Sequence, residues 1–136
     1  MKTAKEIQGD IINLLRESAL AQAVSGQIYR KGYRPLNSKA EDIIVGFVTG
    51  MSGEIEEGVV VVNIYVADIP FGNGLVVENG ARTAEIERLA ADWVESLKAS
   101  RSNYIFSLSQ AIYTEAEREV TEHFVSIRLS YKCFNS

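Results

Sequence analysis

The chain has 136 residues, of which 46% are hydrophobic and 24% charged, a composition that suits one globular domain with a single core. Its net charge of -4, from 14 basic and 18 acidic residues, argues against a domain whose main task is to bind nucleic-acid phosphates. The single cysteine, Cys133, excludes an internal disulfide, so we expect it on a buried strand face in a reducing compartment.

Apolar side chains recur every three or four residues from Thr3 to Ala23, which predicts one amphipathic helix. Charged residues interrupt this stretch too early for a signal peptide, and no later apolar run reaches the length of a membrane span, so we expect a soluble protein. A short strand is predicted at Gln27–Lys31. Pro35 then favours a connecting loop over Tyr33–Asp42.

The strongest strand pattern lies in two runs rich in β-branched residues, Ile43–Thr49 and Val59–Ala67. The polar segment between them, Gly50–Gly58, contains three glycines, and we predict that it is the turn of a β-hairpin.

A second connection, Asp68–Arg82, is predicted to be the least structured part of the chain apart from its apolar residues Leu75, Val76 and Val77. Its glycines invite comparison with phosphate-binding loops. Their spacing fits neither a dinucleotide-binding fingerprint nor a Walker loop, so no phosphate site is predicted.

Thr83 is the predicted N-cap of a helix that runs through Leu97. Its apolar face is continuous and wide, which predicts that the helix packs on a sheet with Trp93 in the core. The residues expected to be buried together are Trp93, Leu89, Leu97, Ile64 and Val62.

Tyr104–Thr114 and Glu122–Cys133 are predicted to form a second hairpin around the charged link Glu115–Glu119. In the last strand, apolar residues alternate with mostly polar ones, and His123 falls on the apolar side. As the only histidine it is a candidate general base, but no Ser or Cys nucleophile motif accompanies it, so a structural role is expected. One His and one Cys are also too few for a zinc or iron site. No catalytic residue, metal or cofactor is therefore predicted.

This order of elements predicts one α+β domain over residues 1–136, with an antiparallel or mixed sheet of about five strands and two helices packed on one face.

Three stretches, Tyr29–Pro35, Ser38–Val45 and Val60–Asp68, carry a resemblance to phage tail terminator or tail completion proteins, in which an arginine- or proline-bearing loop precedes paired strands and a helix. Members of that family form rings that cap the tail tube. The resemblance implies a structural subunit without catalytic activity, which assembles with copies of itself and with other tail proteins, and which is found in the bacterial cytoplasm and then in the virion. The alternatives are a small non-catalytic bacterial binding or oligomerisation module and an enzyme.

Two patches of opposite charge are the predicted interface. The basic patch lies beside Tyr29 and Tyr33, a mixture that can bind single-stranded nucleic acid, although a solvated rim is expected in an acidic protein. Together with unpaired strand edges, the patches suit head-to-tail contact between identical subunits. The predicted interface residues are Arg30, Lys31 and Arg34 on the basic side and Glu54, Glu56 and Glu57 on the acidic side.

Overall fold

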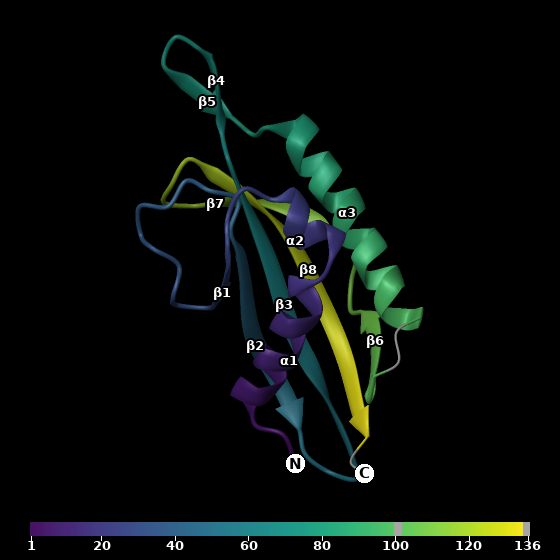
Figure 1. The fold of residues 1–136 in the computed structure, drawn as a ribbon. Coiled ribbons are helices and arrows are strands. Elements are labelled where there is room, and N and C mark those ends of the chain that lie inside the picture. The colour runs from purple at the N-terminus through teal and green to yellow at the C-terminus, as the bar shows by residue number, and fades with distance from the viewer. Residues whose placement is uncertain (100–101, 135–136) are drawn as a thin grey trace.

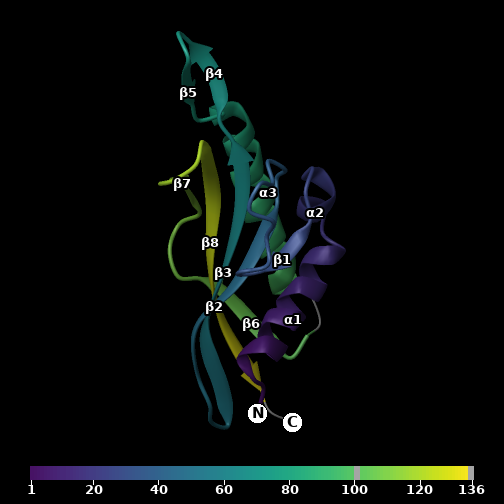
Figure 2. The same ribbon diagram turned by 90° about the vertical axis from the view of Figure 1, so that its left-hand side faces the viewer.

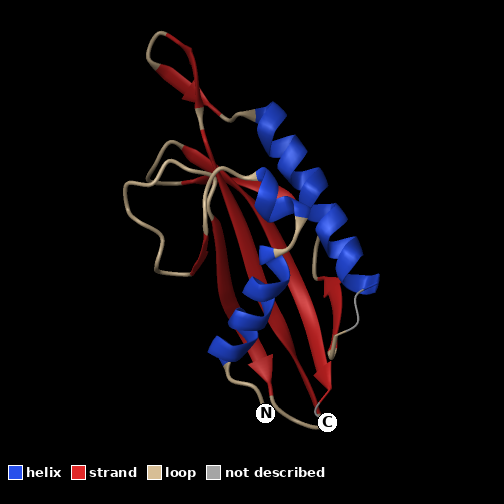
Figure 3. Ribbon diagram, in the orientation of Figure 1, coloured by secondary structure: helices blue, strands red, loops and turns tan. Residues whose placement is uncertain are grey.

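The fold combines helices with one large mixed sheet and one small sheet (Figures 1 and 3). The structure is a computed structural model that describes residues 1–99 and 102–134. Within these residues, the elements are α1 (Ala4–Arg16), α2 (Ala19–Ala23), β1 (Ile28–Arg30), β2 (Ile43–Met51), β3 (Ile55–Ala67), β4 (Ile69–Gly72), β5 (Leu75–Val77), α3 (Gly80–Ala99), β6 (Tyr104–Leu108), β7 (Tyr113–Glu117) and β8 (Glu122–Phe134).

The large sheet has the strand order β1-β2-β3-β8-β6, and β7 pairs with β8 beyond the end of β6. All neighbouring strands are antiparallel except β1 and β2, which are parallel. The helices lie on one face of this sheet (Figure 2). The predicted α+β class and mixed sheet are therefore confirmed, with six strands in the sheet and three helices in the described residues.

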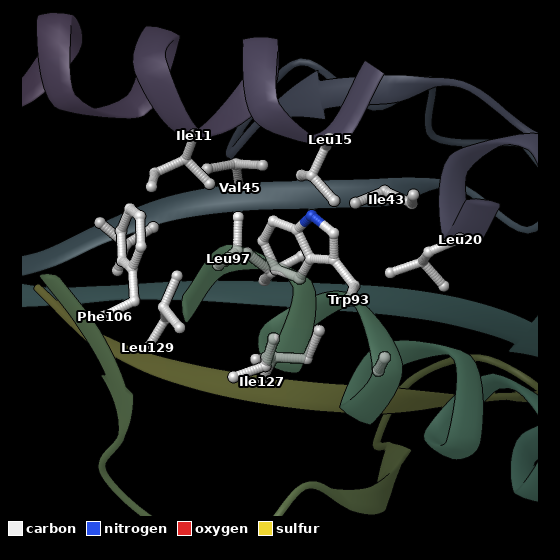
Figure 4. Close-up of a cluster of buried hydrophobic side chains, with 14 of the residues drawn as sticks. Ile11, Leu15, Leu20, Ile43, Val45, Trp93, Leu97, Phe106, Ile127 and Leu129 are labelled. Atoms are coloured by element: carbon white, nitrogen blue, oxygen red, sulfur yellow. The ribbon is translucent and has the colours of Figure 1, made fainter. Parts of the chain in front are cut away.

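The core lies between the helices and the sheet (Figure 4). Trp93 is its centre, and Leu97, Val62 and Ile64 are buried with it as predicted, whereas Leu89 is only partly buried. The alternation predicted for β8 is confirmed, since its buried apolar residues are Val125, Ile127, Leu129, Tyr131 and Cys133.

The prediction of one helix over Thr3–Ala23 is wrong at Ser18, where the helix breaks into α1 and α2. The Ser18 hydroxyl donates to the Leu15 carbonyl at 2.6 Å and accepts from the Ala21 amide at 3.0 Å. This side chain therefore closes one helix and caps the next, which competes with a continuous helical backbone.

The predicted first hairpin is present, but the prediction of a turn over all of Gly50–Gly58 is wrong in part, because β2 extends to Met51, β3 begins at Ile55, and Gly50 lies opposite Gly58 in the ladder. A Cβ atom on Gly58 would lie 2.2 Å from the Thr49 carbonyl oxygen and 2.7 Å from the Tyr131 hydroxyl. These glycines allow close approach between strands and do not mark a turn.

Asp68–Arg82 is not an unstructured connection, since β4 and β5 form a separate two-stranded sheet that projects beyond the end of the large sheet (Figure 1). Its turn, Gly72–Gly74, has positive φ at all three residues. The next helix begins at Gly80, and Asn79 Oδ1 accepts from the Arg82 amide at 3.3 Å. Thr83, the predicted N-cap, is buried inside the first turn.

The predicted second hairpin is present, but its first strand is interrupted between β6 and β7. Ser109 still donates its amide to the Arg128 carbonyl at 2.9 Å, and the chain then leaves the sheet before β7 resumes the pairing with β8. The predicted link Glu115–Glu119 is wrong in part, because β7 extends to Glu117.

Candidate interaction surface

The β4–β5 hairpin, Ile69–Val77, presents apolar side chains that the described part of the chain leaves uncovered. Phe71 is 72% exposed and Leu75 is 61% exposed, and Ile69, Val76 and Val77 are exposed as well. The hairpin contains no charged residue. Exposed apolar patches are typical of surfaces that bind another molecule. We call this segment the projecting hairpin.

The base of the projecting hairpin is held by His123 and two carboxylates. His123 Nδ1 lies 2.7 Å from Oδ1 of Asp68, which precedes β4, and Nε2 lies 3.8 Å from Oε1 of Glu78, which follows β5. Thr83 Oγ1 donates to Oε2 of Glu78 at 2.6 Å, and the Asp68 amide donates to the Thr121 carbonyl. The sequence predicted only a structural histidine, because no local pattern joins His123 to residues so distant in the chain.

The large sheet has an open edge on each side at the same level. On one side, β1 pairs with Ile43–Val45 alone, so Phe47–Met51 of β2 has a strand partner on one side only. On the other side, the described residues place no strand beyond Tyr104–Leu108 of β6. We call these two stretches the edge segments.

The strand register places the edge segments in the same rows of the sheet. Met51 pairs with Glu57, Glu57 with Lys132, and Lys132 with Ile105, so one row crosses all four strands. Neither edge segment contains a charged residue, and Val48, Met51, Ile105 and Leu108 are exposed. Two features that limit pairing at sheet edges are present, the bulge between Phe47 and Thr49 and the shortness of β6.

Alternate residues of β6 direct their backbone groups toward the open side of this strand, away from β8. Phe134 donates its amide to the Asn103 carbonyl and Ser109 donates to the Arg128 carbonyl, which fixes the alternation of the ladder between β6 and β8. Residues at the intervening positions, Phe106 and Leu108 among them, therefore direct their N–H and C=O groups away from β8.

Arg34, predicted to belong to an exposed basic patch, is committed inside the molecule. Its Nε lies 2.9 Å from Oδ2 of Asp42 and its Nη2 lies 2.9 Å from Oε2 of Glu122. The two carboxylate residues are 1% and 3% exposed. The guanidinium also lies 4.3 Å from the Tyr65 ring centroid. Arg34 is therefore not available to a neighbouring subunit, and the prediction that placed it at the interface is wrong.

The pKa of Asp42 reflects this environment. Burial raises it, but hydrogen bonds from Ser38, Arg34 and the Gln27 amide outweigh burial, and the resulting pKa lies below the ordinary value. The carboxylate is therefore stabilised in its charged form by the hydrogen bond from Ser38 together with the ion pair to Arg34.

The remaining predicted interface residues divide in the same way. Glu56 is buried and accepts from the Lys2 amide at 2.9 Å, so it too is wrongly placed at an interface. Arg30 is half-buried and donates from Nη1 to the Lys5 carbonyl and to Gln8 Oε1. The structure leaves Lys31, Glu54 and Glu57 exposed.

Metal binding and membrane insertion have little support in the described residues. No group of three or more His, Cys, Asp or Glu residues among them could hold a metal ion. No helix in residues 1–99 and 102–134 is long and apolar enough to cross a membrane. No protein-family model matches the chain, and no curated protein sequence matches it.

Proposed function

We propose that this protein is a structural subunit of a phage or prophage tail, of the tail terminator or completion type, which acts by assembling with copies of itself and with other tail proteins. The observation that carries the proposal is the projecting hairpin. In an isolated chain the side chains of Phe71 and Leu75 are exposed to water, which is unfavourable. A neighbouring subunit would bury them and gain the hydrophobic free energy of that burial.

The edge segments support head-to-tail contact between copies. The four strands β2, β3, β8 and β6 alternate in direction across the sheet. If β6 of one copy is placed beside β2 of the next copy in the same orientation, the two strands are antiparallel, and the alternation continues without interruption. Such a contact joins two different surfaces and therefore closes into a ring when the rotation between copies allows it.

The test is the association of the purified chain at increasing concentration, measured by light scattering and sedimentation velocity. We expect the wild type to form oligomers and the double variant Phe71→Ser, Leu75→Ser to shift toward monomer. The matched control is Tyr33→Ser, because Tyr33 is a similarly exposed aromatic residue on a different loop.

Negative-stain microscopy of the wild-type oligomers distinguishes closed rings from open chains. Equal association of the wild type and the double variant would remove the hairpin from the interface. A wild type that stays monomeric, alone and with tail proteins, would overturn the assembly proposal.

A further inference from the structure

The helices cover one face of the large sheet, and the opposite face is hollowed near the end where β3 begins. The hollow is a groove of about 530 Å³ to which β2, β3, β8 and β6 all contribute, so it lies between the two edge segments. We call it the sheet groove. Its uncharged lining side chains include Thr49, Met51, Val59, Ile105 and Ser107.

Two charged side chains complete the lining of the sheet groove. Glu57 and Lys132 occupy facing positions on β3 and β8, and both are exposed. No salt bridge among the described residues involves either of them. Their charges cancel, so the groove as a whole is neutral, and both groups can still accept or donate hydrogen bonds. The groove therefore suits an uncharged, mostly apolar occupant that carries one group able both to donate and to accept.

The projecting hairpin has this chemistry. It is uncharged, and the exposed side chains of Phe71 and Leu75 lie on either side of its turn. Asn73 lies at the tip, between two glycines. Its amide donates through the NH₂ group and accepts through the oxygen, so one side chain can bind the carboxylate of Glu57 and the ammonium of Lys132 together.

We propose that the sheet groove of one copy of this chain receives the projecting hairpin of another copy. The proposal rests on the proposed function for taking the partner to be a second copy. It adds the site that receives the hairpin and the direction in which the contact extends the assembly.

The hairpin cannot reach the groove of its own chain. It leaves the sheet where β3 ends, and from Glu57 to Ala67 this strand spans about 33 Å at about 3.3 Å per residue. Figure 1 shows that the hairpin extends further in the same direction, away from the groove. The occupant therefore has to come from another molecule.

The position of the hairpin favours contact between copies placed end to end. Figure 2 shows it on the side of the molecule away from α1 and α2, which is the side of the sheet face that carries the groove. A copy displaced along the strands therefore presents its groove to this hairpin. The contact joins two different surfaces, as the edge contact does, but it runs along the strands and the edge contact runs across them.

The test is cross-linking by a short bismaleimide between two variants of different mass, one of which carries a fusion tag. One chain has Val76→Cys in the hairpin and the other has Ser107→Cys in the groove, while the native Cys133 is buried in both. Docking holds the two thiols at an effective concentration of about 1 mM, so with roughly 100 μM of each chain we expect about ten times more heterodimer than in a control mixture. The control pairs Val76→Cys with Glu95→Cys, an exposed position of α3 outside the groove. Copies joined only through their edge segments keep hairpin and groove at opposite ends, so they should give the control yield.

Two further variants test each half of the contact. Phe71→Ser with Leu75→Ser, added to the hairpin chain, should lower the heterodimer to the control yield. Thr49→Arg, added to the groove chain, places a long charged side chain in the groove and should do the same. Asn37→Arg, on the exposed loop between β1 and β2, adds the same charge elsewhere and should leave the yield unchanged. Circular dichroism checks folding, and either half suffices if the other variant does not fold.

A heterodimer yield equal to the control, in chains that associate by sedimentation velocity, would overturn this inference and leave the proposed function in place. Preferential cross-linking of the Ser107→Cys chain to itself would also overturn it, because the groove would then belong to a symmetrical contact. If the hairpin cross-links to the groove but microscopy shows only open chains, the inference stands and the ring is lost. Chains that stay monomeric at every concentration would remove both.

Discussion

Arg34 determines how the loop between β1 and β2 lies against the sheet. One guanidinium joins Asp42, at the end of that loop, to Glu122, at the start of β8, and it also donates to the carbonyls of Ser38 and Ala40. Burial of two carboxylates is costly unless a cation satisfies both, so the three side chains behave as one unit.

We expect Arg34→Met to lower the free energy of unfolding by about 3–5 kcal/mol at pH 7, because the variant leaves two buried carboxylates without the cation that pairs with both of them. Urea denaturation measures this loss. Lys39→Met, on the exposed part of the same loop, is the control and should change stability by less than about 0.5 kcal/mol.

The loss should shrink as the pH falls. In the wild type the pKa of Asp42 is lowered, so its contribution to stability is present above the ordinary pKa of 3.8 and disappears as the pH falls through the lower pKa of the folded state. The variant lacks the part of this lowering that comes from Arg34, so the difference in stability between wild type and variant should narrow as the pH falls below the ordinary pKa of 3.8. A difference that stays constant from pH 7 down to about pH 2.5 would contradict this account.

At this scale the sequence was a poor guide. It marked Arg34 and Glu56 as charged residues in polar segments, and both are committed inside the molecule. Their partners, Glu122 and the Lys2 amide, lie far away in the chain, and charge alone does not reveal whether a residue faces solvent or a buried ion of opposite sign.

Glycines inside the β2–β3 hairpin explain why the element boundaries were harder to predict than the elements. Gly50 and Gly58 face each other near the Tyr131 hydroxyl. A Cβ atom on Gly58 would overlap the facing backbone, and one on Gly50 would overlap the side chains of Tyr131 and Phe47. In sequence, such glycines resemble turn residues, because both uses depend on the missing Cβ atom. The β-branched run of β3 and the alternating pattern of β8, by contrast, identified both strands correctly, and the alternation in β8 also identified its buried face.

Gly58→Ala should lower the free energy of unfolding by about 1–3 kcal/mol, because the new methyl group would overlap the Thr49 carbonyl and the Gly50 Cα atom. Thermal unfolding followed by circular dichroism measures the change. Gly53→Ala, where the nearest atom would lie 3.5 Å away, serves as the control and should be nearly neutral. Equal stability of the two variants would show that the strands separate here without cost.

For the whole molecule, the edge segments lead to a prediction that separates backbone pairing from side-chain contact. Leu108→Pro removes an N–H group that points to the open side of β6 and leaves the bonds to β8 intact. Leu108→Ala also removes the leucine side chain, but it keeps the backbone N–H group.

We expect both variants to fold, as judged by circular dichroism, and only Leu108→Ala to associate nearly as well as the wild type in sedimentation velocity. If Leu108→Pro associates equally well, strand pairing through β6 is not part of the interface, and the projecting hairpin would have to supply the contact by other means.

The position of β8 in the sheet has a consequence for the order of folding and assembly. This strand follows every other strand in the chain, yet it lies between β3 and β6, and β6 and β7 have β8 as their strand partner in the described sheet. Pairing of β3 with β8 requires closure of a long loop, which is slow relative to the local β2–β3 hairpin. Until that step, β6 has no sheet to belong to, and its open edge does not exist. Addition of one copy to the next through β6 would therefore select chains that have already completed their own sheet, so folding itself would act as the checkpoint for assembly.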